Sequence, residues 1–262
     1  MKPAMGLVVA LPAEARFLIG WGPWERRGRF ISRRLCLDDG TDLLCVRSGM
    51  GTQNAFSAAR WLVSEGVSAL AVLGISGGLD PRLKTGDLIV GKTVLDKDGK
   101  GTRCVWKSNS GLVESAYKAL KAKEMTAHMG AVITAERAVL SAERKQSIYR
   151  ETHALAVDME SSAVGQTATD AGLAFFLLRA ICDTSDQNIP EELFLCLDPS
   201  GKTCFSPLIN SLLRRPSLMA ELLRTRSRFV TALKSLRRGW RIQVDNHLPA
   251  LLVSPDSRLI TD

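Results

Sequence analysis

Two acidic residues and a strand-end pair of opposite charge mark the part of the sequence best suited to hold a compact polar ligand. Asp158 and Glu160 stand at the entry to a segment of helical periodicity, and Arg179 and Asp183 end the apolar run that follows it. In α/β proteins, ligands bind outside the carboxyl ends of the strands. Charges of both signs would therefore meet a compact polar ligand there.

Three more clusters of polar or small residues follow apolar runs: Leu11–Arg16, Arg47–Gly51 and Gly74–Gly78. The glycines of the third cluster would let the backbone approach a ligand closely, because glycine has no Cβ. Each cluster alone is equally typical of a tight turn or a solvated helix start. Their repetition at successive strand ends predicts a single site.

The elements that must position these clusters alternate along the chain. Apolar runs of about four to eight residues predict strands between segments of helical spacing. The predicted strands cover 5–10, 29–37, 43–47, 67–73, 87–94, 130–134, 154–157 and 173–181, and the predicted helices cover 52–65, 111–121, 141–151 and 160–171. This alternation predicts a single α/β domain over residues 1–240, with a central mixed sheet flanked by helices.

The composition excludes several classes of protein. No apolar run in the 262 residues approaches the roughly 20 residues of a membrane-spanning helix. The six cysteines show no CxxC spacing and the three histidines are far apart, so neither a metal site nor a disulfide framework is expected. Free cysteines favour a reducing, cytoplasmic location.

The positive charge is concentrated near the C-terminus. Residues 207–241 hold nine Lys and Arg and one acid, which equals the net charge of +8 of the whole chain. We expect basic C-terminal helices over 207–240, broken at Arg215–Pro216, and a flexible tail over 241–262. The basic face is either simply solvated or meets anionic lipid headgroups. Nucleic-acid binding is not expected, because no aromatic residues are interleaved with the charge.

Taken in order, five segments resemble the nucleoside phosphorylase and nucleosidase superfamily. They are LVVALPAEARFL (7–18), RSGMG (47–51), GISGGLDPRLKTGDLIV (74–90), AVDMES (156–161) and LLRAICD (177–183). The resemblance covers residues 5–190 and rests on the spacing of all five. It implies a nucleoside phosphorylase-like fold, cleavage of the bond between ribose and a purine, no cofactor and a homo-oligomeric assembly.

The sequence is most similar to the hopanoid-associated phosphorylases, in its GLDP and DMES motifs and in the later segment LLRRPSLMAELL. This similarity implies release of adenine from adenosylhopane, and therefore contact with a membrane. The alternatives are a methylthioadenosine/S-adenosylhomocysteine or futalosine-type nucleosidase, and a non-catalytic lipid- or nucleic-acid-binding protein that kept the fold.

The resemblance also implies roles for individual residues. Asp183 is expected to protonate the departing purine, which requires a carboxyl pKa raised by burial. Glu160 is expected to bind the ribose hydroxyls, with Met159 packed on the sugar. Glu14 and Arg179 complete the catalytic set. The expected nucleophile-binding residues are Arg16, Arg47, Gly74 and Ser76, and the expected base pocket is formed by Gly77, Gly78, Val157 and Cys182.

The nucleophile stays open between water and phosphate as a co-substrate. Glu14 could deprotonate water but would repel phosphate, whereas Arg16 and Arg179 would attract it. The sequence also departs from the family pattern. Ile75 stands where many members have serine or threonine, Val72 replaces a phosphorylase arginine, Cys182 replaces a serine, and Ala138 replaces the aromatic that stacks on the base. These changes argue against a standard methylthioadenosine enzyme.

Overall fold

The computed structural model describes residues 4–98, 101–108, 110–192 and 218–254. The elements follow the alternation expected from the sequence. They are β1 (Ala4–Val9), α1 (Pro12–Ile19), β2 (Glu25–Arg27), β3 (Phe30–Cys36), β4 (Asp42–Arg47), α2 (Thr52–Ser64), β5 (Ala69–Gly78), β6 (Leu88–Asp98), β7 (Gly101–Lys107), α3 (Ser110–Ala122), β8 (Ala127–Thr134), α4 (Ala142–Thr152), β9 (Ala156–Asp158), α5 (Ser161–Asp170), β10 (Ala174–Asp183), α8 (Leu218–Asp245) and α9 (Leu248–Val253).

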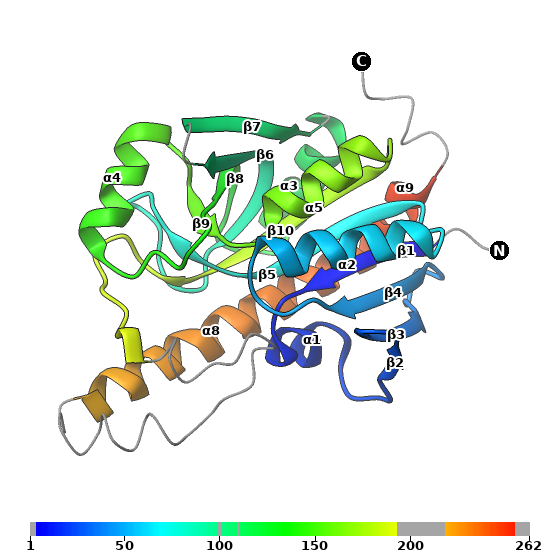
Figure 1. Ribbon diagram of the computed structural model, residues 1–262, viewed down its shortest axis with the longest axis horizontal. Helices are drawn as coiled ribbons and strands as arrows, with labels where there is room; N and C mark the ends of the chain where they lie inside the picture. Colours follow the sequence, from blue (N-terminus) through cyan, green and yellow to red (C-terminus); the bar gives the residue numbers. More distant parts are fainter. Residues whose placement is uncertain (1–3, 99–100, 109, 193–217, 255–262) are drawn as a thin grey trace.

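The described strands form one mixed sheet that partly closes on itself (Figure 1). β5 pairs in parallel with β1 on one side and with β10 on the other. The path from β10 through β6, β8 and β9 returns to the end of β5, where Gly77 and Gly78 pair with Val157 and Ala156. A single α/β domain with a mixed sheet is thereby confirmed.

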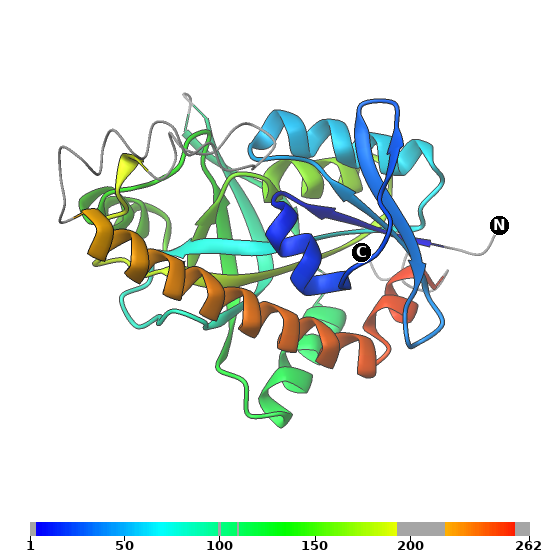
Figure 2. The same ribbon diagram turned by 90° about the horizontal axis from the view of Figure 1, so that it is seen from below.

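Helices cover the sheet on both faces, as Figures 1 and 2 show. On one face, α2 and α5 pack over a core that includes Leu62 and Val164. On the other, α1, α3, α8 and α9 pack over a second core, where Trp240 of α8 is buried. Burial on both faces explains why the central strands are continuously apolar in sequence.

The glycine segment at residues 74–78 differs from its expected form. It was expected to be a loop after a strand ending at residue 73, but it continues β5 to Gly78. Arg179 pairs with Gly74, and the following residues of β10 keep the two strands together. The strands therefore carry their polar residues side by side into the site.

The C-terminal region corrects the prediction of a tail. Residues 241–245 complete α8, and α9 follows after His247, whose φ of 56° ends the first helix. Trp240, Val244, Leu248 and Leu252 recur every fourth position, and all four are buried. This spacing continues the apolar face past residue 240, so one face of residues 241–253 packs into the core.

Other expectations for this region fall beyond what is described. The first basic helix, its break at Arg215–Pro216 and residues 255–262 lie outside the described residues. Within the described part, no helix is long and apolar enough to cross a membrane.

Candidate active site

Glu14 is a buried carboxylate that joins α1 to the central sheet. It lies in the first turn of α1, and its Oε2 accepts the backbone N–H of Leu11 at 2.8 Å. Its Oε1 accepts the N–H of Ile75 on β5 at 2.9 Å. Burial raises the pKa of Glu14, while these hydrogen bonds and the charge of Arg179 act against the rise. The net effect is a pKa of Glu14 above its ordinary value.

Gly74 allows Glu14 and Arg179 to lie next to each other on the sheet. A Cβ at position 74 would come within 2.4 Å of Arg179 Nη1 and within 2.7 Å of Glu14 Oε1. Both distances are far below van der Waals contact, so any larger residue would displace one charged group. The glycine at this position is thus a spatial requirement of the site.

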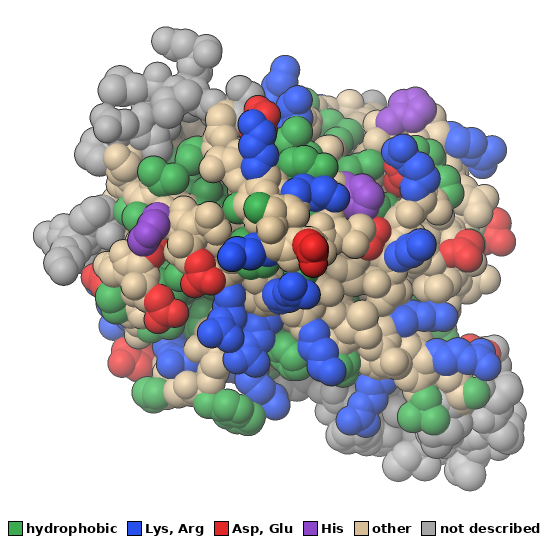
Figure 3. Space-filling model, turned by 180° about the vertical axis from the view of Figure 1, so that it is seen from behind, with side chains coloured by type: hydrophobic (Ala, Val, Ile, Leu, Met, Phe, Trp, Pro, Cys, Tyr) green, Lys and Arg blue, Asp and Glu red, His purple; other side chains and the backbone are tan. Residues whose placement is uncertain are grey.

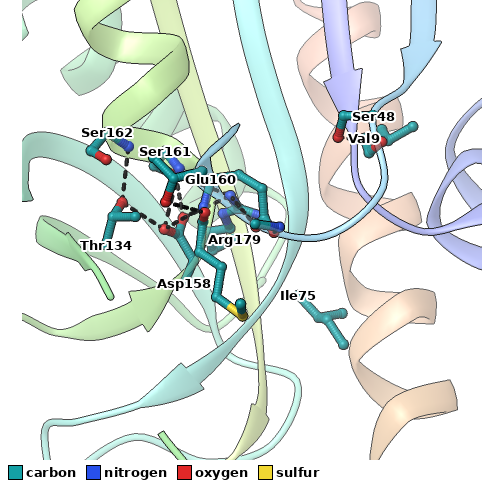
Figure 4. A network of polar contacts seen from close by, with 12 residues as sticks. Val9, Ser48, Ile75, Thr134, Asp158, Glu160, Ser161, Ser162 and Arg179 are labelled. Carbon is teal, nitrogen blue, oxygen red and sulfur yellow. Dashed lines mark hydrogen bonds and ion pairs between the residues drawn. The ribbon is translucent and has the colours of Figure 1, made fainter. Parts of the chain in front are cut away.

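Arg179 is fully buried and is held by groups at the entry to α5 (Figure 4). Its Nη2 lies 2.6 Å from Asp158 Oδ2 and donates to Ser161 Oγ at 3.0 Å. It also reaches Glu160 Oε2 at 3.5 Å. Burial disfavours the charged form, but the carboxylates outweigh it and raise the pKa of Arg179. Arg179 is therefore a permanent cation.

Asp158 is the main anchor of this arginine, a role that its local sequence pattern does not predict. Thr134 Oγ1 donates to its Oδ1 at 2.8 Å, and the Ser161 hydroxyl donates to its Oδ2. The backbone N–H of Ser161 adds a further bond at 3.2 Å. With its oxygens engaged in this way, Asp158 orients Arg179.

Glu160 lies where the loop after β4 meets the start of α5. Its Oε1 accepts the N–H of Gly51 at 3.0 Å, and Thr52 donates to the carbonyl of Met159 at 3.1 Å. Burial raises the pKa of Glu160 to about 7; Arg179 lowers it, and Asp158 raises it further. The second oxygen of Glu160 makes the longest of the Arg179 contacts, so it can turn toward a ligand hydroxyl.

Asp183 ends β10 on the other side of Gly77, where the predicted base pocket gathers. A Cβ at Gly77 would lie 3.2 Å from both Asp183 Oδ2 and Val157 Cγ1. A Cβ at Gly78 would lie 3.2 Å from the carbonyl oxygen of Asp183, and the neighbouring Cys182 is buried. Burial raises the pKa of Asp183, while Lys145 and Arg228 act to lower it. A carboxyl with a raised pKa is suited to donate a proton.

Ser76, Arg16 and Arg47 were also expected to bind the nucleophile, and their surroundings differ. Ser76 Oγ is buried and has no hydrogen-bond partner within the described chain, which leaves it available to a ligand. Arg16 is exposed and stacks over Trp21 at 4.5 Å, and Arg47 stacks over Trp24 at 4.7 Å. Both arginines are engaged with tryptophans, and Arg179 is the cation that acts on Glu14 and Glu160.

Lys145 is the functional candidate that the sequence pattern concealed. It lies in a charged segment that resembles a solvated helix, yet its side chain is fully buried and forms an ion pair with Asp183. The available signal is its spacing, because Lys145 shares a helix face with the buried Ile148, three residues on. Among the described residues, no group of three or more metal-ligating side chains is present.

Comparison with known proteins assigns this site to an enzyme that cleaves the glycosidic bond of nucleosides. The family model of the phosphorylase superfamily matches residues 4–195, and the chain belongs to this superfamily. A 5'-methylthioadenosine/S-adenosylhomocysteine nucleosidase of Staphylococcus aureus is 25% identical over 170 residues, covering 59% of this chain and 75% of the relative.

Solved structures show the same fold. The futalosine hydrolase of Helicobacter pylori superposes with a TM-score of 0.72 at 16% identity, covering 93% of this chain and 98% of that one. The 5'-methylthioadenosine/S-adenosylhomocysteine nucleosidase of Neisseria meningitidis has a TM-score of 0.71 at 20% identity, with coverages of 93% and 99%.

Proposed function

We propose that this enzyme hydrolyses a purine ribonucleoside, releases adenine and uses water held by Glu14 as the nucleophile. The observation that carries the proposal is the approach of Glu14 and Arg179 over Gly74. Glu160 lies beside Arg179, and Asp183 ends the same strand four residues later. The proposed base, sugar-binding group and acid are thus linked through Arg179 and strand β10.

The chemistry divides among these groups. As the glycosidic bond breaks, the departing purine gains negative charge and the ribose gains positive charge. Asp183 donates a proton to the purine, a contribution of about 10²–10⁴-fold in rate. Glu160 binds the ribose hydroxyls, and its negative charge stabilises the developing cation on the sugar. Glu14 accepts the proton of the attacking water.

The charge of the site favours water over phosphate. Glu14, Asp158 and Glu160 surround a single described arginine, which Asp158 already engages at 2.6 Å. A phosphate dianion would be repelled by these carboxylates. Arg16 and Arg47 each stack on a tryptophan. Water carries no such penalty, and a buried carboxylate can deprotonate it.

For the 5' substituent of the nucleoside, the proposal is the lipid chain of adenosylhopane. The similarity to hopanoid-associated phosphorylases supports it, as does the departure at Ala138 from the aromatic pattern of the methylthioadenosine enzymes. The second candidate is methylthioadenosine or S-adenosylhomocysteine, which the names of the Staphylococcus aureus relatives support. Futalosine is supported in the same way by the name of a solved neighbour.

The deciding experiment measures adenine release from adenosylhopane, or a 5'-alkylated adenosine, and from methylthioadenosine. Each substrate is tested with and without inorganic phosphate. Release that is faster from the lipidic substrate and indifferent to phosphate is expected. Release that requires phosphate overturns the role of water, and preference for methylthioadenosine selects the second candidate. Absence of release from either substrate overturns the enzymatic proposal itself.

The exposed side of α8 supports a peripheral contact with anionic membrane, from which a lipid-linked nucleoside would be taken. Lys and Arg side chains gather across this face (Figure 3). Its exposed basic residues are Arg224, Arg226, Lys234, Arg237, Arg238 and Arg241. Each basic residue near an anionic surface contributes about 1 kcal/mol.

Co-sedimentation with phosphatidylglycerol-containing vesicles tests this contact, with phosphatidylcholine vesicles as the control. The expected result is binding to the anionic vesicles alone, reduced when Arg224, Arg226 and Lys234 are changed to serine. Equal recovery with both vesicle types contradicts the contact. The homo-oligomer implied by the family resemblance stays a prediction, which sedimentation equilibrium of the full chain can check.

A further inference from the structure

Lys145 places a buried positive charge directly against the acid of the site. The residue lies in α4, and its side chain is fully enclosed. Its Nζ forms an ion pair with Asp183 Oδ2 and donates to the carbonyls of Thr184 at 3.1 Å and Gln187 at 2.8 Å. A lysine is rarely buried to this degree unless it is paired.

The surroundings of Lys145 offer oxygen atoms to its side-chain nitrogen on three sides. The carbonyls of Thr184 and Gln187 accept hydrogen bonds from Nζ, and Asp183 Oδ2 forms the ion pair. An ammonium group has three N–H donors and no acceptor, so an environment made of oxygen atoms suits it.

We propose that Lys145 is a positioning residue for the acid: it fixes the carboxyl of Asp183 through Oδ2 and stabilises the carboxylate that remains after Asp183 has given its proton to the departing base. The proposal rests on the proposed function. With Oδ2 held by Lys145, the other oxygen is free to carry the proton that the purine takes. This arrangement makes the acid both oriented and easier to deprotonate at the moment of bond cleavage.

The protons balance without any transfer from Lys145. The electron pair of the glycosidic bond leaves with the purine, which takes the proton of Asp183. The attacking water gives its oxygen to the sugar and its proton to Glu14. Solvent then returns a proton to Asp183 and removes one from Glu14, while Lys145 stays charged throughout.

The other groups around Asp183 influence its carboxyl less than Lys145 does. Arg228 on α8 favours the ionised form of Asp183 through its charge, after the stronger influence of Lys145. The neighbouring Cys182 has a pKa raised to about 12 by burial, so it is neutral. The adjoining part of β5 is Gly77 and Gly78, which bring no charge. Lys145 is the group in direct contact.

The test compares Lys145→Met with Lys97→Met. Lys97 forms an ion pair with Glu151 at the far end of α4, so its replacement removes a similar pair away from the site. Without Lys145, kcat for adenine release should fall about ten- to a hundredfold with little change in KM, within the range of a general acid. The alkaline limb of kcat/KM should move up by about one to three pH units, because an adjacent cation lowers a carboxyl pKa by that amount. Lys97→Met should change neither.

A second variant and a second readout separate a positioning role from a structural one. Lys145→Gln keeps donors for the carbonyls of Thr184 and Gln187 but removes the charge, and it should show the same upward shift. The carboxyl ¹³C titration of Asp183, assigned with Asp183→Asn, should move upward in both neutral variants without any substrate. The proposal is overturned if a folded Lys145→Met or Lys145→Gln protein keeps the wild-type alkaline limb of kcat/KM and the wild-type titration of Asp183. Wild-type protein that releases no adenine while the titration still shifts instead overturns the proposed function.

Discussion

The carboxylate of Glu14 accepts the backbone N–H of Ile75 at 2.9 Å, across 61 positions of sequence. This bond ties the first turn of α1 to β5, at the point where Gly74 gives Arg179 room. Ile75 takes part through its backbone, so the site accepts a departure from the serine or threonine common at this position. The side chain of Ile75 instead packs against the core on the α8 side.

Replacement of Glu14 with glutamine should reduce kcat by about 10²–10⁴-fold, because an amide cannot accept a proton from water. KM should change little, since Glu160 still binds the ribose. Steady-state kinetics of adenine release measures both constants. Glu143→Gln, in the first turn of α4, is the matched control and should behave as wild type. Activity of Glu14→Gln within threefold of wild type, roughly half a kcal/mol, would exclude the base role.

Asp183→Asn should remove most turnover and leave the fold intact, because an amide has the shape of the acid but cannot donate its proton. In the wild type, the raised pKa of Asp183 keeps the carboxyl protonated at low pH. We therefore expect kcat/KM to fall as the pH rises through that pKa. Circular dichroism checks the fold, and Asp186→Asn serves as the control at an exposed aspartate nearby. Near-normal turnover would refute the acid role.

Glu160 should make both substrate binding and stability depend on pH. Its pKa rises from 4.5 to about 7 in the folded protein, so the folded state holds more protons between these values. The contribution of Glu160 to stability is complete below about 4.5 and is lost as the pH rises through 7. Urea unfolding at several pH values should show this decline, and Glu160→Gln should reduce it.

The same residue affects the KM in the opposite direction. Ionised Glu160 accepts bonds from the ribose hydroxyls, so KM should increase as the pH falls below about 7. Glu114→Gln, at an exposed position on α3, should alter neither dependence. A decline in stability that is identical in Glu160→Gln would show that other buried carboxyls cause it.

Gly74→Ala should damage activity and stability together. The added methyl group would lie 2.4 Å from Arg179 Nη1, so the guanidinium or the Glu14 carboxylate must move. Overpacking of this kind costs about 1–3 kcal/mol. Thermal unfolding and kcat should both fall clearly. Gly165→Ala, on α5, is the comparison, because its nearest contact would be at 3.2 Å. Unchanged kinetics in Gly74→Ala would contradict the close approach.

The local pattern of the sequence determined most of the fold. Apolar runs and helical spacing located the central strands and the helices α2 to α5, because burial on both faces leaves a clear mark on sequence. The same reasoning failed after Trp240, where α9 begins beyond a sharp bend at His247. An apolar face that continues across a bend is not visible as one periodic segment.

The site was determined in part by sequence and in part by tertiary structure. The strand-end positions of Arg179 and Asp183 and the helix-entry position of Glu160 follow from local pattern, because strand ends in such sheets meet at one edge. How deeply each charged side chain is buried does not follow from the local sequence pattern. Arg16 and Lys145 are both basic residues on helices, yet one is exposed and the other is enclosed beside the acid. The contacts of Lys145 with Asp183, Thr184 and Gln187 make that difference, since burial arises from contacts between distant segments.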